Sequence, residues 1–160
     1  MRLPGGLTVT GTPTATAARV AVLTSAADAI TAARAYAASI ADGAITRDRA
    51  GQVPYPELAA LDASGLLGIT VPAAHGGAEL PPVVLAEVIR TIAAVDPAIA
   101  QIPQAHFLFV DVLAVHGSPA QQRRLFTDVL AGARLGNGVD RKSTRLNSSH
   151  QGTSRMPSSA

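Results

Sequence analysis

The sequence contains no cysteine and no tryptophan, and its aromatic residues are limited to two tyrosines and three phenylalanines. Without cysteine the chain can form neither a disulfide nor a thiolate metal site, which fits a reducing compartment. With so few aromatic rings, the core must be packed mainly by alanine, valine, leucine and isoleucine. Because alanine is the strongest helix former, this composition favours helices.

Uninterrupted apolar runs of membrane-spanning length are also lacking. Pro4 and Gly5 interrupt the N-terminus before the apolar part of a secretory signal could form. We therefore expect a cytoplasmic protein with no membrane partner.

The net charge of +2 is concentrated at one end of the chain. Residues 140–160 hold four basic residues and one acidic residue, a balance of +3, whereas residues 1–139 hold nine arginines and ten acidic residues, a balance of −1. The body of the protein is thus not basic, and nothing in its charge predicts a nucleic-acid partner.

The hydrophobic pattern predicts an all-α domain of about five helices over residues 19–135, after a flexible leader over residues 1–18. Residues 66–71 form an apolar run that fits either a short strand or a buried turn of helix. Asp96 and Ser118 are predicted N-caps, the latter in a capping box with Gln121. The predicted core includes Ile30, Leu67, Val88, Ile92, Ile99 and Phe126.

Pro103 falls inside the apolar stripe that starts at Pro97. It has no N–H to donate to the carbonyl of Ile99, so we predict either a kink there or a regular helix that starts near Pro103.

The last segment differs in composition from the rest. Residues 140–160 contain the chain's single lysine, Lys142, and many serines, with no helical or strand period. Asp140–His150 (DRKSTRLNSSH) and Ser154–Ala160 (SRMPSSA) resemble the in-frame translation of a sequencing-library adapter, separated by the place of a sample index. We expect residues 140–160 to be a non-native disordered tail, so that the native sequence breaks off after about Val139. The alternative is a disordered tail that belongs to the native protein.

Four stretches in order resemble the N-terminal helical domain of the acyl-CoA dehydrogenase superfamily. They are Ala63–Pro72 (ASGLLGITVP), His75–Gly77 (HGG), Leu85–Arg90 (LAEVIR) and Ala94–Pro97 (AVDP). The resemblance implies that this domain precedes a β-barrel domain, starting at about residues 136–139, and a C-terminal helical bundle. It also implies FMN or FAD as the cofactor of the full-length protein, a small-molecule substrate and a homo-oligomer.

Three further stretches are similar to sulfur-acquisition oxidoreductases, the relatives of dibenzothiophene monooxygenase. They are Arg47–Arg49 (RDR), Gln101–Phe107 (QIPQAHF) and Gly132–Asn137 (GARLGN). The sequence departs from that branch at Ala105, where a polar residue is usual, and at His75, where an aromatic residue is usual.

The resemblance makes His106 and Asn137 the candidate catalytic residues. In the functional interpretation, His106 projects into a flavin–substrate cavity and relays a proton. In the structural interpretation, it is a core histidine paired with a backbone carbonyl. Asn137 is either a hydrogen-bond donor to the flavin, and so also a cofactor contact, or a turn residue between two glycines.

Gln101 and Phe107 are the candidate substrate contacts, and no histidine spacing indicates a metal site. The resemblance implies a reduced-flavin monooxygenase of small organosulfur compounds. An acyl-CoA dehydrogenase and a stand-alone helical interaction module are the alternatives. We expect the chain as given to be inactive, because most contacts to the flavin would come from domains that it lacks.

Overall fold

The computed structural model describes residues 20–136. Within that range the chain is helical and contains no strand, which confirms the all-α prediction. The expected leader, the tail at residues 140–160 and the candidate Asn137 lie outside the described residues. The elements in chain order are α1 (Ala26–Ala41), α2 (Ala44–Ala50), α3 (Tyr55–Ala63), the 3₁₀ turns η1 (Leu66–Gly68) and η2 (Ala73–His75), α4 (Pro82–Ala93), α5 (Pro97–Gln101), α6 (Pro103–His116) and α7 (Pro119–Leu130).

The described residues form seven α-helices, two more than the expected number of about five. One addition is α2, a helix of seven residues that starts directly after the left-handed Gly43. The other comes from Pro103, because α5 ends at Gln101 and α6 begins at Pro103. The predicted interruption at Pro103 is therefore confirmed. The apolar run at residues 66–71 is not a strand: it begins with the buried 3₁₀ turn η1 at Leu66–Gly68 and continues as an irregular turn.

The helix caps predicted at Asp96 and Ser118 are present, whereas α1 is capped by Ser25 and not by Thr24, its neighbour, as the sequence had suggested. Asp96 Oδ1 accepts a hydrogen bond from the Ile99 N–H at 3.0 Å, which starts α5. Ser118 and Gln121 form the reciprocal capping box that starts α7. Each cap satisfies backbone N–H groups that would otherwise lack a partner at a helix start.

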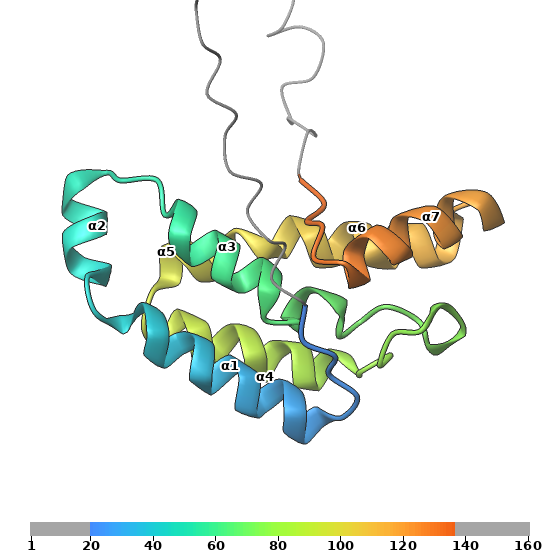
Figure 1. Ribbon diagram of the computed structural model, residues 1–160, viewed down its shortest axis with the longest axis horizontal. Helices are drawn as coiled ribbons and strands as arrows, with labels where there is room; N and C mark the ends of the chain where they lie inside the picture. Colours follow the sequence, from blue (N-terminus) through green and yellow to red (C-terminus); the bar gives the residue numbers. More distant parts are fainter. Residues whose placement is uncertain (1–19, 137–160) are drawn as a thin grey trace, which may run out of the picture.

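Two clusters of buried side chains hold the helices together. Figure 1 shows α1 and α4 side by side along one edge of the molecule, with α6 and α7 on the other. The first cluster joins α1 and α4 to α3, α5 and η1, and the second lies between α6 and α7. Five of the six predicted core residues are buried: Leu67, Val88, Ile92, Ile99 and Phe126.

Ile30 is the exception, since it is only partly buried. The inward side of α1 consists of Ala29, Ala33, Tyr36, Ala37 and Ile40, so Ala29 takes the place at the first turn that was predicted for Ile30. The alanines allow α1 to lie close to α4, and Tyr36 fills the space near α3, where its hydroxyl donates to the Glu57 carbonyl at 3.0 Å. Ile30 differs from the prediction because alanine is abundant on every side of α1, so the period alone does not mark which residue of the first turn faces inwards.

The segment Pro97–His116 has the length and mean hydropathy of a membrane-crossing helix. No uninterrupted apolar run in the sequence is that long, because Gln101, His106 and Asp111 interrupt this one. Averaged over the whole segment, the hydropathy is nevertheless high enough. Its inward residues pack in both core clusters, and the core helix of a soluble protein passes the same test. Length and composition are therefore weak evidence for a membrane span here.

Candidate functional site

His106 lies in the interior of the domain, with none of its surface exposed. Its Nε2–H donates to the Leu67 carbonyl of η1 at 2.9 Å, and its Nδ1 accepts from the Leu135 N–H at 3.0 Å. Because Nδ1 accepts a hydrogen bond, it carries no hydrogen itself, so the imidazole ring is neutral. Burial of the imidazole lowers its pKa from the ordinary value of 6.5.

These contacts bear on the two interpretations of His106, and its catalytic role stays a prediction. A proton relay needs a ring nitrogen that can reach a substrate or a water molecule. Both nitrogens of His106 are bonded to the backbone. In residues 20–136, the structural interpretation of a paired core histidine is the one that the contacts support.

Phe107 and Gln101 lie on different sides of the segment α5–α6. Phe107 is buried in the first core cluster, edge-on to the His106 ring with centroids 5.1 Å apart. Its side chain is thus part of the core of the described domain, and its role as a substrate contact stays a prediction. Gln101 is exposed at the end of α5 and stays available as a contact. Asn137 lies just beyond the described residues, so its two roles stay predictions.

Sequence reasoning missed a second apolar side of α6. The side chains of Leu108, Val112 and Val115 are 59%, 42% and 74% exposed. Together with Ala105 they form a stripe at helical spacing, which we call the outer face of α6. Gln101 lies in register with this stripe, one turn before Ala105. The signal was present in the sequence, because α6 is apolar on nearly all sides.

A shallow apolar hollow of about 350 Å³ borders the outer face of α6. It lies between α6 and α7 and ends where the described chain ends, at Leu135 and Gly136. Its walls are Phe109, Val112, Leu113, Leu125 and Leu135, with His116 and Gln121 also in its lining. It holds no arginine or lysine that could bind a phosphate group.

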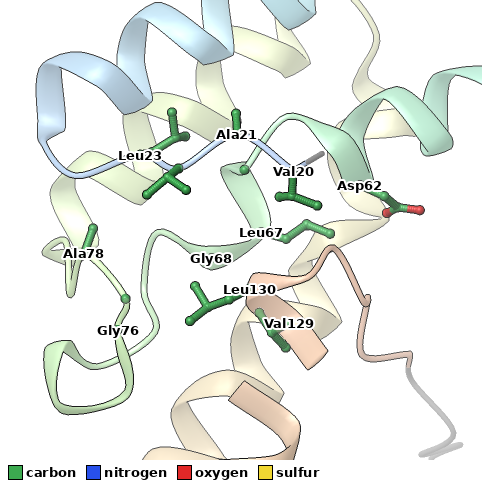
Figure 2. Close-up of a pocket in the computed structure, with 13 residues that line it drawn as sticks. Val20, Ala21, Leu23, Asp62, Leu67, Gly68, Gly76, Ala78, Val129 and Leu130 are labelled. Atoms are coloured by element: carbon green, nitrogen blue, oxygen red, sulfur yellow. The ribbon is translucent and has the colours of Figure 1, made fainter. Parts of the chain in front are cut away.

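A second hollow, of about 170 Å³, lies beside the segment Val20–Leu23 (Figure 2). Val129 and Leu130 of α7 and the loop at Gly76–Ala78 complete it, and Asp62 is its one charged residue. Burial raises the Asp62 pKa above the usual 3.8, and Arg134, 3.6 Å away, acts in the opposite direction. Since pockets for drug-sized ligands measure about 300–1,000 Å³, this hollow is too small for a flavin.

The loop His75–Gly77 has a structural role. Gly76 adopts a left-handed conformation with φ of 85°, and a Cβ on Gly77 would lie 2.0 Å from the Val71 carbonyl oxygen. The His75 ring packs on Phe126 with centroids 4.9 Å apart. Within residues 20–136 no group of three histidine or acidic side chains could hold a metal ion.

The chain is similar to known proteins over this same region. The family described as "Acyl-CoA dehydrogenase, N-terminal domain" matches residues 26–133. Dibenzothiophene monooxygenases of Rhodococcus erythropolis and Rhodococcus qingshengii are each 35% identical over 104 residues, which is 64% of this chain and 24% of the relative. The dibenzothiophene monooxygenase of Mycolicibacterium goodii is 40% identical over 83 residues, which is 51% of this chain and 20% of the relative.

No solved structure matches the chain. The chain spans about a quarter of the length of the curated relatives that it matches. The family match covers all the described helices, from the start of α1 to just beyond α7. The chain therefore belongs to the acyl-CoA dehydrogenase family and carries its N-terminal helical domain.

Proposed function

We propose that the complete protein is a flavin-dependent oxidoreductase, and more specifically a reduced-flavin monooxygenase that acts on small organosulfur compounds. The observation that carries this proposal is the similarity to proteins named dibenzothiophene monooxygenase over 104 residues. A full-length homo-oligomer with FMN or FAD is part of the same proposal.

The described residues do not fit a flavin by themselves. The larger of the two hollows described above is apolar and open, and neither contains a cluster of basic side chains for a phosphate group. The flavin supplies the redox chemistry when it is bound, and the protein positions groups and excludes water. The helical domain provides one surface of the flavin–substrate site, and the remaining contacts to the flavin come from other parts of the complete protein.

We propose that the outer face of α6 is this surface. A helix that is apolar on nearly all sides is normally buried on nearly all sides, yet Leu108, Val112 and Val115 are exposed here. Val112 of this face also lines the apolar hollow between α6 and α7. The outer face thus forms an apolar, water-excluding wall, and the Gln101 amide at its start orients a polar group of the substrate.

The alternative is an acyl-CoA dehydrogenase, which the family match also favours. That reaction removes a proton next to a thioester with a carboxylate base. The two functions share the helical domain and differ in residues beyond it. A glutamate at the base position would favour dehydrogenation, and its lack would favour monooxygenation.

The test starts from the genomic DNA downstream of codon 139, because we propose that residues 140–160 are translated adapter. The complete protein, supplied with reduced FMN or FAD, ¹⁸O₂ and dibenzothiophene, should yield a product that contains ¹⁸O by mass spectrometry. Acyl-CoA oxidation with an artificial electron acceptor, and no labelled product, would support the alternative instead.

A pair of matched variants tests the role of Gln101 in the complete protein. Gln101→Ala should raise KM for the organosulfur substrate, because the amide contact is lost. Gln52→Ala, also exposed but in the loop between α2 and α3, is the control and should leave KM unchanged. Equal effects of the two substitutions would contradict the proposed contact.

A further inference from the structure

After α7 the chain reverses direction and returns to the domain. Gly132 makes this turn with φ of 95°, and a Cβ there would lie 2.9 Å from the Asp62 carbonyl oxygen. The residues that follow, 133–136, lead out of the described domain, and we call them the exit segment. The turn is tight enough to require glycine, so the path of the exit segment is set at its start.

Three contacts hold the exit segment against the domain. The Leu135 N–H donates to His106 Nδ1 at 3.0 Å. The Leu135 side chain packs on the second core cluster. Arg134 Nη1 lies 3.6 Å from Asp62 Oδ1 of α3. The backbone and both side chains are therefore engaged before the chain reaches Asn137.

His106 is the link between the exit segment and the centre of the domain. Its other nitrogen bonds to Leu67, 39 residues earlier in the sequence, whereas Leu135 comes 29 residues later. One buried ring thus joins η1, α6 and the exit segment. This arrangement requires a donor on one edge of the ring and an acceptor on the other, which the neutral imidazole provides.

We propose that His106 is a positioning residue that, as the neutral Nε2–H tautomer, fastens the exit segment to η1. It thereby fixes the place and direction in which the chain leaves the helical domain towards Asn137. The proposal rests on contacts within residues 20–136 and does not depend on the flavin chemistry.

Protonation of His106 would break this link. A charged imidazole has two donors, so Nδ1–H would face the Leu135 N–H, and the bond would be lost. The charged groups around the ring are Asp62, which favours protonation, and Arg134, which opposes it. Burial, the largest influence, lowers the His106 pKa, so the link is complete above pH 6.5 and is lost as pH falls through the lowered pKa.

The tautomer is tested by NMR of the 160-residue chain with ¹⁵N-labelled histidine, with the chain unfolded in urea as the reference. We expect His106 to show the Nε2–H tautomer and to stay neutral at pH values where the unfolded reference is half protonated. An Nδ1–H tautomer, or titration of His106 together with the reference, would overturn the proposal.

Amide hydrogen exchange tests the link itself. His106→Phe removes both hydrogen bonds and keeps a ring in place, so the protection of the Leu135 amide should fall about tenfold, while Val88 and Ile92 in α4 keep their protection. If the variant does not fold, the protection of the Leu135 amide relative to that of Val88 and Ile92 is measured in the unaltered chain as pH is lowered through the His106 pKa. If the protection of the Leu135 amide changes only as much as that of the α4 amides in either experiment, His106 only fills the core and the proposal is wrong.

Discussion

Arg47 Nη2 lies 3.1 Å from Asp96 Oδ2, joining α2 to the start of α5 across 49 residues of sequence. The same guanidinium contacts Glu57 Oε1 of α3 at 2.9 Å and donates to the Ile40 carbonyl of α1 at 2.7 Å. Four helices thus meet at one partly buried arginine. Arg47, the first residue of the stretch Arg47–Arg49 that resembles sulfur-acquisition oxidoreductases, thus links helices within this domain.

Substitution of Asp96 should separate its two roles. Asp96→Ala removes both the N-cap and the ion pair, so the free energy of unfolding should fall by about 3 kcal/mol. Asp96→Asn keeps the cap and should lose only about 1–2 kcal/mol. Urea denaturation measures both losses, with Asp128→Ala on the exposed side of α7 as the control. Equal losses for the two substitutions would show that the N-cap contributes nothing, and an unchanged stability of Asp96→Asn would show the same of the ion pair.

Gly77 should not tolerate a side chain. Its Cβ would lie 2.0 Å from the Val71 carbonyl oxygen, and backbone cannot give way as a flexible side chain can. We expect Gly77→Ala to lower the free energy of unfolding by about 1–3 kcal/mol. Gly136→Ala, where a Cβ would meet nothing within 4 Å, is the control and should change the melting temperature little. Comparable melting temperatures for the two variants would contradict the close approach.

The outer face of α6 should accept charge in this chain but not in the complete protein. Leu108→Lys should change the stability of the 160-residue chain by less than about 0.5 kcal/mol, because the side chain is 59% exposed. Val110→Lys, on the buried side of the same helix, should prevent folding. In the complete protein Leu108→Lys should reduce flavin retention or activity. Full activity there would mean that this face stays in water.

The 160-residue chain should neither retain flavin nor catalyse oxidation. Pockets bury most of a ligand's surface, and of the two hollows described above one is too small and the other too shallow for an isoalloxazine ring. Protein mixed with FMN or FAD should show no flavin absorbance after desalting and no quenching of flavin fluorescence at micromolar protein. Retained flavin would show that the helical domain provides much more of the site than we propose.

The helical class, the helix starts at Asp96 and Ser118, the break at Pro103 and most of the core could all be predicted from the sequence. These features depend on groups within one or two helical turns: a side chain that accepts from a nearby N–H, a missing donor, or an apolar period. The resemblance added the family, which the match over residues 26–133 confirmed.

Tertiary structure alone decided what His106 does, because its partners Leu67 and Leu135 are separated from it by 39 and 29 residues. It also decided that Phe107 faces the core while Leu108 faces outwards, since α6 is apolar on nearly all sides and its period favours no one side. The reason is physical. A local pattern states which groups need burial or a hydrogen bond, but the partner is chosen by whichever distant backbone or side chain the packing brings within reach.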